Sequence, residues 1–188
     1  MNKKDNSHFY TNGAFNEEKA KEAYFEMMEG FGYPITDNLR QNMWVVDFSL
    51  GRFAEVGMAG IFWVNELEGK YFGHEIFLLP GQMIAEHAHV KTDKAGPKME
   101  AWHVRHGFAH FFGEGNESAE AVKIIPTAEY GFTTVRNLSI CKQGDIGKLN
   151  KAKAKHFMVG GPEGLIVTEY GSYHDGDGLR FTNPRVKF

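Results

Sequence analysis

Two histidines separated by a single residue, His87 and His89, are the most chemically suggestive pair in this sequence. In a β-strand successive side chains point to opposite faces, so these two imidazoles share a face and can reach one metal ion. Glu100 follows after an irregular stretch that can fold out as a loop, and His156 begins a later β run. Three histidines and one glutamate form an N3O ligand set with one or two exchangeable positions. Open positions are typical of catalytic metal sites, so we predict a catalytic metal centre.

The same histidines also have a simpler interpretation that involves no metal. A His-x-His pair alone is often two surface or partly buried residues, and only Glu100 and His156, each in a predicted strand, favour a ligand set. The chain has nine histidines, of which His74 is a candidate for a pocket position. Five others are predicted to be structural or exposed: His8, His103, His106, His110 and His174.

The first forty residues are predicted to contain two helices. The segment from Asn16 has an N-cap candidate, acidic residues in its first turn and strong helix formers. Glycines and a proline at residues 30–34 end it, and a second short helix is predicted to follow Thr36 or Asp37 and end near Met43. Short helices cannot bury their own apolar stripes, so residues 1–43 are predicted to form a helical extension packed on the rest of the chain. The stripe of the first helix consists of Ala20, Tyr24, Met27 and Met28.

From residue 44 onwards the sequence contains short runs rich in Phe, Val, Ile and Trp, separated by glycine turns. Many short strands with regular turn signals indicate an antiparallel barrel or sandwich. No internal repeat or low-complexity linker divides the chain, so we predict one mainly β folded unit, with residues 44–188 as the barrel. The predicted strands lie near residues 44–50, 58–65, 71–79, 101–112, 120–125, 132–140, 146–149, 156–159 and 164–170.

Composition and charge exclude several classes of protein. The 188 residues are 42% hydrophobic, which is enough for a core and excludes a largely disordered chain. With 21 basic and 24 acidic residues the net charge is −3, which argues against nucleic acid or an anionic membrane as a partner. No apolar run approaches the roughly 18 residues of a spanning helix, and the polar residues 1–13 do not resemble a signal peptide. The single cysteine, Cys141, permits no intramolecular disulfide, so we expect a cytoplasmic protein.

The metal-ligand candidates belong to a longer pattern that resembles the first motif of the cupin superfamily. This pattern runs from Gly81 through the His-x-His pair and Glu100 to Gly107, although its spacer of ten residues is longer than in the common motif. The second cupin motif, residues 144–156, is degenerate. The long spacer is similar to that of the D-lyxose isomerase family of cupins, as are Pro80-Gly81-Gln82, Glu86-His87, Lys98-x-Glu100, Arg105-x-Gly107, Val167-Thr168-Glu169 and Phe181-Thr182-x-Pro184-Arg185.

The resemblance implies a cupin-type antiparallel β-barrel, or jelly roll, with a C-terminal tail over its mouth. It also implies that His87, His89, Glu100 and His156 hold a divalent metal, usually Mn2+, with Fe2+, Co2+, Ni2+ or Zn2+ as alternatives. Members of the family interconvert aldoses and ketoses, with D-lyxose and D-xylulose as the first pair to try here. A homodimer is expected, and the helical stripe offers apolar surface either for docking on the barrel or for a partner.

Two residues beside the ligand candidates suit the proton transfer that such a reaction needs. Glu169 lies in the apolar run 166–170, which would otherwise bury an unpaired carboxylate, so it is the candidate base. Lys98 precedes Glu100 by two residues and is predicted to share its face. There it can stabilise an enediolate or shuttle a proton. The simpler interpretations are an outward-facing strand glutamate and a solvated loop lysine.

His74 and Arg185 are the candidates for contacts with the sugar. His74 stands where the family tends to have lysine, thirteen residues before the first ligand histidine. Arg185, in the C-terminal tail, either holds sugar hydroxyls or pairs with surface acids. Two further departures from the family are Arg180, where aspartate is usual, and Asn183. Two acids in the preceding loop are candidates to replace the lost carboxylate: Asp175 and Asp177.

Two other functions remain open at this point. An iron-dependent cupin dioxygenase uses the same kind of N3O site, but it has no need of Lys98 and Glu169. A sugar-binding cupin without catalytic activity is the second alternative. The sequence has neither a basic cluster nor a glycine-rich loop at a helix start, which favours an unphosphorylated sugar.

Overall fold

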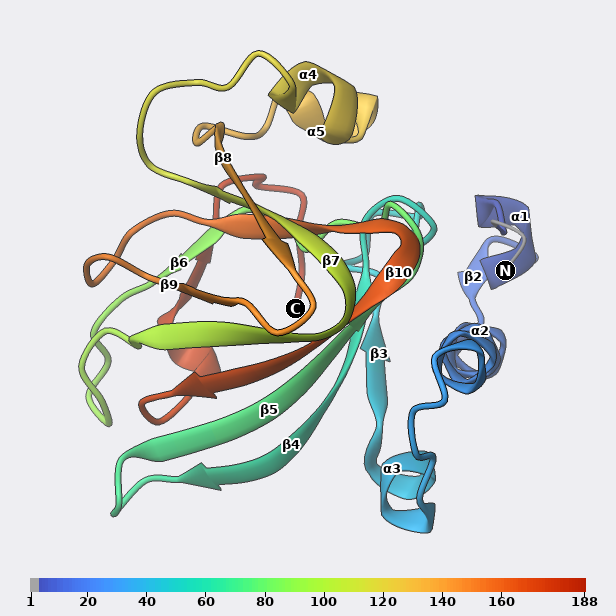
Figure 1. Ribbon diagram of the computed structural model, residues 1–188, viewed down its shortest axis with the longest axis horizontal. Helices are drawn as coiled ribbons and strands as arrows, with labels where there is room; N and C mark the ends of the chain where they lie inside the picture. The colour runs from blue at the N-terminus through green and yellow to red at the C-terminus, as the bar shows by residue number, and fades with distance from the viewer. Residues whose placement is uncertain (1–3) are drawn as a thin grey trace.

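The computed structural model describes residues 4–188 and shows a curved antiparallel β-structure with helices along its N-terminal side (Figure 1). The main sheet has seven strands in the order β3-β4-β5-β10-β7-β8, with β9 also paired to β7, and two smaller sheets pair β1 with β2 and β6 with β11. The helices are α1 (Asn6–Phe9), α2 (Glu17–Gly30), α3 (Asp37–Asn42), α4 (Ala121–Ile124), α5 (Thr127–Tyr130) and the 3-10 turn η1 (Gly176–Gly178). The strands are β1 (Tyr10–Thr11), β2 (Ala14–Phe15), β3 (Trp44–Val46), β4 (Met58–Glu66), β5 (Tyr71–Leu78), β6 (His87–His89), β7 (Glu100–Gly113), β8 (Asn137–Lys142), β9 (Ile146–Lys148), β10 (Phe157–Gly171) and β11 (Leu179–Phe181).

The predicted mainly β, antiparallel fold is confirmed. Strand β10 lies at the centre of the sheet and pairs with β5 on one side and β7 on the other. The two strands predicted at 156–159 and 164–170 are one strand, because its pairing with β7 resumes after a register shift between Gly160 and Leu165. β8 and β9 follow the other side of β7 and form the edge of the sheet.

The prediction of a strand at 120–125 is wrong. Residues Ala121–Ile124 form α4, and the N–H of Ile125 closes its turn by donating to the carbonyl oxygen of Ala121. Apolar side chains alone indicated a strand here, but only Ala121 and Ile125 are buried, while Val122 is 58% exposed. This spacing of buried residues fits a helical turn. The predicted strand at 132–140 begins later, at Asn137.

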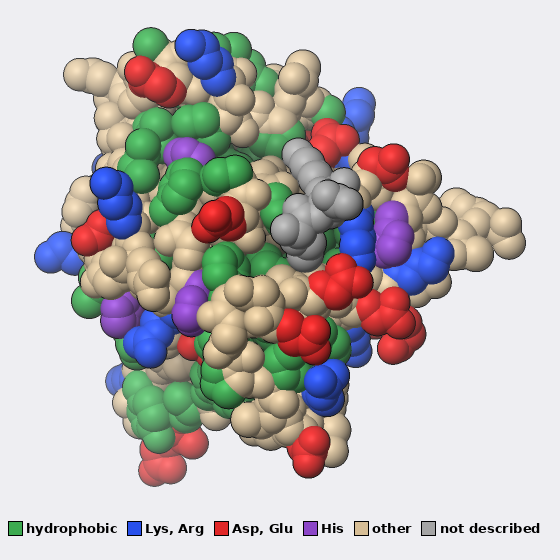
Figure 2. All heavy atoms as spheres, turned by 45° about the vertical axis from the view of Figure 1, so that its right-hand side comes forward, with side chains coloured by type: hydrophobic (Ala, Val, Ile, Leu, Met, Phe, Trp, Pro, Cys, Tyr) green, Lys and Arg blue, Asp and Glu red, His purple; other side chains and the backbone are tan. Residues whose placement is uncertain are grey.

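Both predicted N-terminal helices are confirmed. The side chain of Asn16 caps α2 by accepting from the N–H of Lys19 at 3.1 Å, and Thr36 caps α3 through the N–H of Leu39 at 3.2 Å. These caps satisfy N–H groups that have no partner within the helix. Figure 2 shows acidic, basic and hydrophobic side chains interspersed on the face turned toward the viewer, in keeping with the small net charge.

The apolar stripe of α2 docks on the barrel and is not left exposed for a partner. All four of its residues are buried, in one cluster with side chains of β4, β5 and β10. The hydroxyl of Tyr24 donates to Oε1 of the buried Gln82 at 2.6 Å. Gly164 makes room for Met27, since a Cβ at this residue, where φ is +91°, would lie 2.2 Å from Met27 Sδ.

The C-terminal tail returns along the strand that carries the first two histidines. β11 pairs with β6 so that Phe181 lies opposite His87 and Leu179 opposite His89. Further on, the N–H of Lys187 donates to the carbonyl oxygen of Phe48 at 3.0 Å. The division of the chain into residues 1–43 and 44–188 stays a prediction. Among residues 4–188, no helix has the length and apolar character needed to cross a membrane.

Candidate metal centre and adjoining pocket

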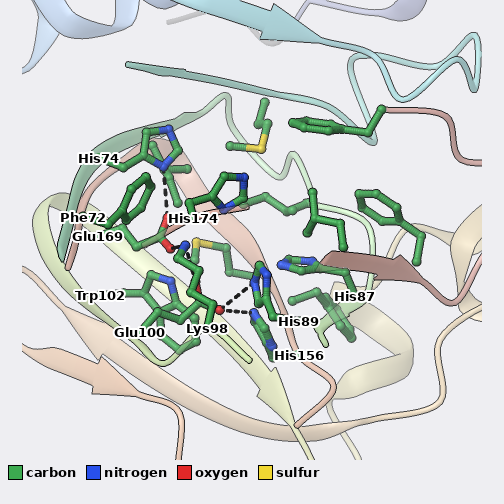
Figure 3. Close-up of a pocket in the computed structure, with 18 of the residues that line it drawn as sticks. Phe72, His74, His87, His89, Lys98, Glu100, Trp102, His156, Glu169 and His174 are labelled. Carbon is green, nitrogen blue, oxygen red and sulfur yellow. Dashed lines mark hydrogen bonds and ion pairs between the residues drawn. The ribbon is translucent and has the colours of Figure 1, made fainter. Parts of the chain in front are cut away.

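Four side chains predicted as metal ligands meet inside the barrel (Figure 3). His87 and His89 are the two ends of β6, His156 is bridged to His87 just before β10, and Glu100 begins β7. One potential ligand atom from each lies within 4.8 Å of the other three. The two histidines of β6 share a face, and the loop of residues 90–99 returns the chain so that Glu100 lies beside them. Together with His156, the ligand candidates therefore come from three segments of the chain.

Backbone carbonyl groups orient two of the three imidazoles. Nδ1 of His87 lies 2.9 Å from the carbonyl oxygen of Ala85, and Nδ1 of His156 lies 3.0 Å from that of Ala154. An Nδ1–H that donates to a carbonyl fixes the tautomer and leaves the Nε2 lone pair free, as in metal-binding histidines generally. Both rings thus present Nε2 as their ligand atom.

Bare lone pairs meet at the centre of this cluster. Oε1 of Glu100 lies 3.0 Å from Nε2 of His89 and 2.9 Å from Nε2 of His156. Nε2 of His89 and Oε1 of Glu100 are buried, yet neither forms a hydrogen bond with residues 4–188. Buried polar atoms without partners are rare in folded proteins. A divalent cation bound by these atoms explains their convergence, so the residues present fit a metal.

The charges at two members of the cluster are those a cation site needs, whereas at His156 the effect of burial is outweighed by Glu100, which raises the pKa of that imidazole above its ordinary value. Burial lowers the pKa of the His87 imidazole well below its ordinary value, and His156 and His89 add to the effect, so the ring is neutral. Burial alone would raise the pKa of Glu100, but the charge of Lys98 and the neighbouring Glu169, His156 and His89 outweigh it and hold the pKa well below its ordinary value. The cluster therefore presents a neutral imidazole at His87 and an ionised carboxylate at Glu100.

Glu86, the neighbour of His87, ties together three segments around the site. Its buried carboxylate accepts from the N–H of Thr134 at 2.7 Å, the N–H of Val135 at 3.0 Å and the hydroxyl of Thr182 at 2.5 Å. These donors come from the loop before β8 and from the C-terminal tail. The acidic residue before the His-x-His pair is thus an anchor that holds the tail beside β6.

We expect Glu86→Gln to reduce the free energy of unfolding by about 2 kcal/mol, since hydrogen bonds to a charged group contribute roughly 1.5–3 kcal/mol each and an amide nitrogen would face donors. Urea unfolding followed by circular dichroism measures the change. A loss below about 0.5 kcal/mol, the range of an ordinary surface substitution, would contradict this role for Glu86.

Lys98 and Glu169 lie directly beside the ligand cluster. Nζ of Lys98 donates to Oε2 of Glu100 at 2.8 Å and also to Oε1 of Glu169, while Nδ1 of His74 lies 3.0 Å from Oε2 of Glu169. Burial opposes the charge of Lys98, but Glu100 and Glu169 outweigh it and raise the pKa of the ammonium group above its ordinary value. The sequence alone suggested that the carboxylate of Glu169 would be unpaired. In the structure Lys98 binds one of its oxygens and His74 binds the other.

Nδ1 of His74 binds Glu169, and the ring packs between neighbouring side chains and the backbone of β4. Its ring stacks on Trp44, with ring centroids 5.5 Å apart and planes 14° apart. Nε2 is buried, and a Cβ at Gly60 would lie 2.2 Å from it and 2.7 Å from the Trp44 ring. The structure thus places His74 in the pocket wall, where Nδ1 holds Glu169 and Nε2 is buried without a hydrogen-bond partner among residues 4–188.

For this reason Gly60→Ala is expected to displace His74 and Trp44 and to lower the turnover of any reaction that uses Glu169, by roughly 10-fold or more for a shift of about 1 Å. The change lies outside the pocket lining, so metal content should stay the same. Steady-state kinetics with metal analysis provides the measurement. Turnover equal to that of the unmodified protein would show that the placement of His74 does not matter.

His174 was predicted to be structural or exposed, and the structure corrects this. Its ring lines the pocket, stacked on Phe72 with centroids 5.5 Å apart and 6.0 Å from the ring of His89. Burial, with Lys98 and His89 as further causes, lowers its pKa to about 3. Nothing in the local sequence marks this histidine, because the loop after β10 brings it to the pocket only when the barrel closes.

Several other predicted residues lie away from the pocket. Arg185 places its guanidinium group over the ring of Phe132 at 5.2 Å, so the structure gives no support to its predicted sugar contact. Arg180 bonds to backbone carbonyls of its own turn, and Asn183 is buried with its amide donating to Glu129 at 2.8 Å. Of the three departures from the family pattern, only His74 lines the pocket.

Asp175 and Asp177 do not replace a pocket carboxylate. Asp175 accepts from the hydroxyl of Thr92 at 2.8 Å, and Asp177 pairs with Lys94 at 3.3 Å. These contacts fasten the long spacer to the loop that carries His174. The spacer thereby gains a fixed conformation, which places Lys98 inside the pocket.

The remaining pocket wall is largely apolar and aromatic, which sequence reasoning did not identify. Three phenylalanines from distant segments, Phe48, Phe181 and Phe188, lie with ring centroids 5.6–6.1 Å apart. Trp102, on β7, packs 5.2 Å from His156. Such a wall excludes water from the charged groups and so strengthens their interactions.

Comparisons with known proteins agree with this fold and with the sequence resemblance. No protein-family model matches the chain. It is 28% identical over 169 residues to the D-lyxose ketol-isomerase of Cohnella laeviribosi, covering 90% of this chain and 91% of the relative. It is also 28% identical to the D-lyxose/D-mannose isomerase of Thermosediminibacter oceani, covering 89% and 91%.

Solved structures show the same architecture at lower identity. The L-ribose isomerase of Cellulomonas parahominis with L-ribose superposes with a TM-score of 0.69 at 15% identity, covering 94% of this chain and 96% of that one. The L-ribose isomerase of Acinetobacter sp. DL28 with L-ribose gives 0.68 at 15%, covering 90% and 91%. These likenesses concern the fold. The chain thus has the fold of these isomerases, and its sequence is similar to those of the D-lyxose isomerases.

Proposed function

We propose that this protein is a metal-dependent aldose–ketose isomerase that acts on an unphosphorylated pentose or hexose through an enediol, with D-lyxose and D-xylulose as the first pair. One observation carries the proposal. The ligand cluster and a buried carboxylate, Glu169, are bridged by a single ammonium group, that of Lys98. The naming of related proteins as D-lyxose isomerases supports the choice of substrate class.

The metal is assigned to His87, His89, Glu100 and His156. A divalent ion bound there supplies positive charge near the two oxygens of the sugar between which the carbonyl moves. Nitrogen and carboxylate ligands of this mixture suit Mn2+, our first choice, and also Fe2+, Co2+, Ni2+ or Zn2+. The metal identity therefore has to be measured.

Glu169 is the proposed base. Its carboxylate removes the proton from C2 of the aldose and returns it to C1, while O1 gains a proton and O2 loses one. His74 donates to the second carboxylate oxygen and so fixes the orientation of Glu169, which makes His74 a positioning residue. Reaction also requires that a carboxylate oxygen be free to face carbon, so the contact between Glu169 and Lys98 must loosen when a sugar binds.

Lys98 is proposed to carry the complementary proton. Its ammonium group lies between two carboxylates and 4.1 Å from the centre of the Phe72 ring, which restricts where it can point. In this position it can donate to a sugar oxygen as negative charge develops and can move a proton between O1 and O2. This pairing of a base with a proton donor distinguishes the site from that of a dioxygenase or a sugar-binding cupin.

A screen of aldopentoses and aldohexoses with the metal-loaded protein tests the proposal. Ketose formation is measured for each sugar after addition of Mn2+, in parallel with oxygen uptake after addition of Fe2+. We expect D-lyxose to be converted to D-xylulose. Oxygen uptake without ketose would favour the dioxygenase, and sugar binding without turnover would favour the sugar-binding protein.

A homodimer and a cytoplasmic location complete the proposal. With the α2 stripe docked on the barrel, the surface available for a second copy must lie elsewhere. Exposed aromatic side chains on β4 and β5 outside the pocket lining support such a surface, since Trp63 and Tyr71 are 43% and 52% exposed. Light scattering of the purified protein gives its mass in solution and tests the dimer.

A further inference from the structure

His174 is a polar side chain in the pocket wall to which the proposed reaction assigns no task. It follows the end of β10 by three residues and lines the same cavity as the ligand cluster and Lys98 (Figure 3). Its Nδ1 is buried and has no hydrogen-bond partner among residues 4–188. A native protein rarely leaves such an atom unsatisfied without a functional reason.

The position of this histidine is fixed by three contacts. Asn65, on β4, binds the backbone of His174 on both sides. Its amide nitrogen donates to the carbonyl oxygen at 2.9 Å, and its amide oxygen accepts from the N–H at 2.9 Å. The ring of Phe72, on β5, stacks against the imidazole with an angle of 28° between the planes. Residues of β4 and β5 thus fix both the backbone and the ring of His174, which is unusual for a loop residue without a function.

Outside the metal-ligand cluster, the two side chains assigned to proton transfer have their hydrogen bonds within the protein. Lys98 bonds to Glu100 and Glu169, and Glu169 also bonds to His74. An imidazole keeps at least one N–H donor in either protonation state, and its neutral form adds an acceptor. A sugar chain has hydroxyl groups beyond C1 and C2, and these need partners when water is excluded. His174 can supply such a partner at the edge of the reacting centre.

We propose that His174 binds a hydroxyl group of the sugar that does not react, and that Asn65 positions it for this contact. The proposal rests on the proposed isomerase function for the identity of the ligand, a polyhydroxylated chain. His174 is thereby a specificity residue, because a sugar that lacks this hydroxyl leaves its nitrogen unpaired.

The first test substitutes His174 by phenylalanine, which keeps the stacking on Phe72 and removes both nitrogens. For the metal-loaded protein and D-lyxose, we expect KM to rise about 10-fold while kcat changes less than threefold, as for the loss of one hydrogen bond to substrate. Metal content should not change. His103→Phe serves as the matched control, since His103 lies on β7 outside the pocket lining and should leave KM unchanged.

Deoxy sugars separate a hydroxyl contact from a general change in packing. Analogues of D-lyxose that lack the hydroxyl at C3, C4 or C5 are compared with the parent sugar in both proteins. We expect the effect of His174→Phe on kcat/KM to vanish for one analogue and to persist for the others. An equal effect on all analogues, or a change below twofold on D-lyxose, would overturn the proposal.

Asn65 is tested through a double-mutant cycle. Asn65→Ala should raise KM in the unmodified protein and have no further effect in the His174→Phe background, because it acts through His174. A merely structural role for Asn65 would give additive changes in the two backgrounds, and that result would refute the positioning role.

Calorimetric titration with D-arabinitol distinguishes failure of this inference from failure of the proposed function. This pentitol has the hydroxyls of reduced D-lyxose and cannot be isomerised. Binding that is about 10-fold weaker in His174→Phe supports the contact even if no aldose is turned over. Equal binding in both proteins overturns the contact even if isomerisation is observed. A protein that neither binds the pentitol nor converts any aldose contradicts both proposals.

Discussion

Glu169→Gln is expected to bind the metal as before and to lose isomerisation by roughly 10³-fold, the range attributed to a positioned acid or base. Glutamine has nearly the same shape as glutamate, so the apolar surroundings of β10 remain filled. It cannot take a proton from carbon. The amide can still accept from His74 or from Lys98, which limits the disturbance to the pocket. Ketose formation by the variant and its metal content are the two measurements.

Glu75→Gln is the matched control for this experiment. Glu75 is also buried and lies on β5 next to His74, but it accepts from the Thr168 hydroxyl at 2.7 Å and the Trp63 indole at 3.1 Å and does not line the pocket. Isomerisation should stay within a few-fold of the unmodified rate. Turnover in Glu169→Gln that equals the unmodified rate would contradict the assignment of the base.

His87→Ala is expected to weaken metal binding by at least about 100-fold, because even the loss of an outer partner of a ligand costs 10–100-fold. Three ligand candidates remain in this variant, but one Nε2 is absent and the hydrogen bond between His87 and Ala85 is lost. Activity should fall in parallel at limiting metal. Titration of the apoprotein with Mn2+, read by calorimetry, measures the affinity.

His103→Ala controls for the removal of an imidazole from the same region of sequence. His103 lies on β7 between Trp102 and Val104, on the face opposite the ligand cluster, and should leave the metal affinity unchanged. Retention of stoichiometric metal with unaltered affinity in His87→Ala would refute the ligand set.

Strand parity made much of the site predictable. It puts His87 with His89 and Lys98 with Glu100, and both pairs share a face in the structure. The predicted base, Glu169, also lies at the site because β10 pairs with β7, which Glu100 begins. The helix cap at Asn16 is a local interaction and could be read from the sequence, whereas the sequence allows the second helix to begin after Thr36 or Asp37, and the structure shows that Thr36 caps it.

Contacts between distant loops were not predictable in the same way. His174 enters the pocket because Asn65, 109 residues earlier, fastens its backbone, and no periodicity encodes such a contact. The α4 segment contains residues that favour strands, yet it is helical, because tertiary packing overrides this local preference. Arg185 was assigned from its place in the tail, whereas its side chain turns to Phe132.

The central claim is that this protein isomerises a sugar with the help of a metal held by His87, His89, Glu100 and His156. The most direct measurement follows the conversion of D-lyxose to D-xylulose by protein treated with a chelator and by the same protein after Mn2+ is restored. We predict no ketose without metal and full recovery after its addition. Ketose formation that is unaffected by the chelator, or none from any aldopentose or aldohexose with metal present, would contradict the account.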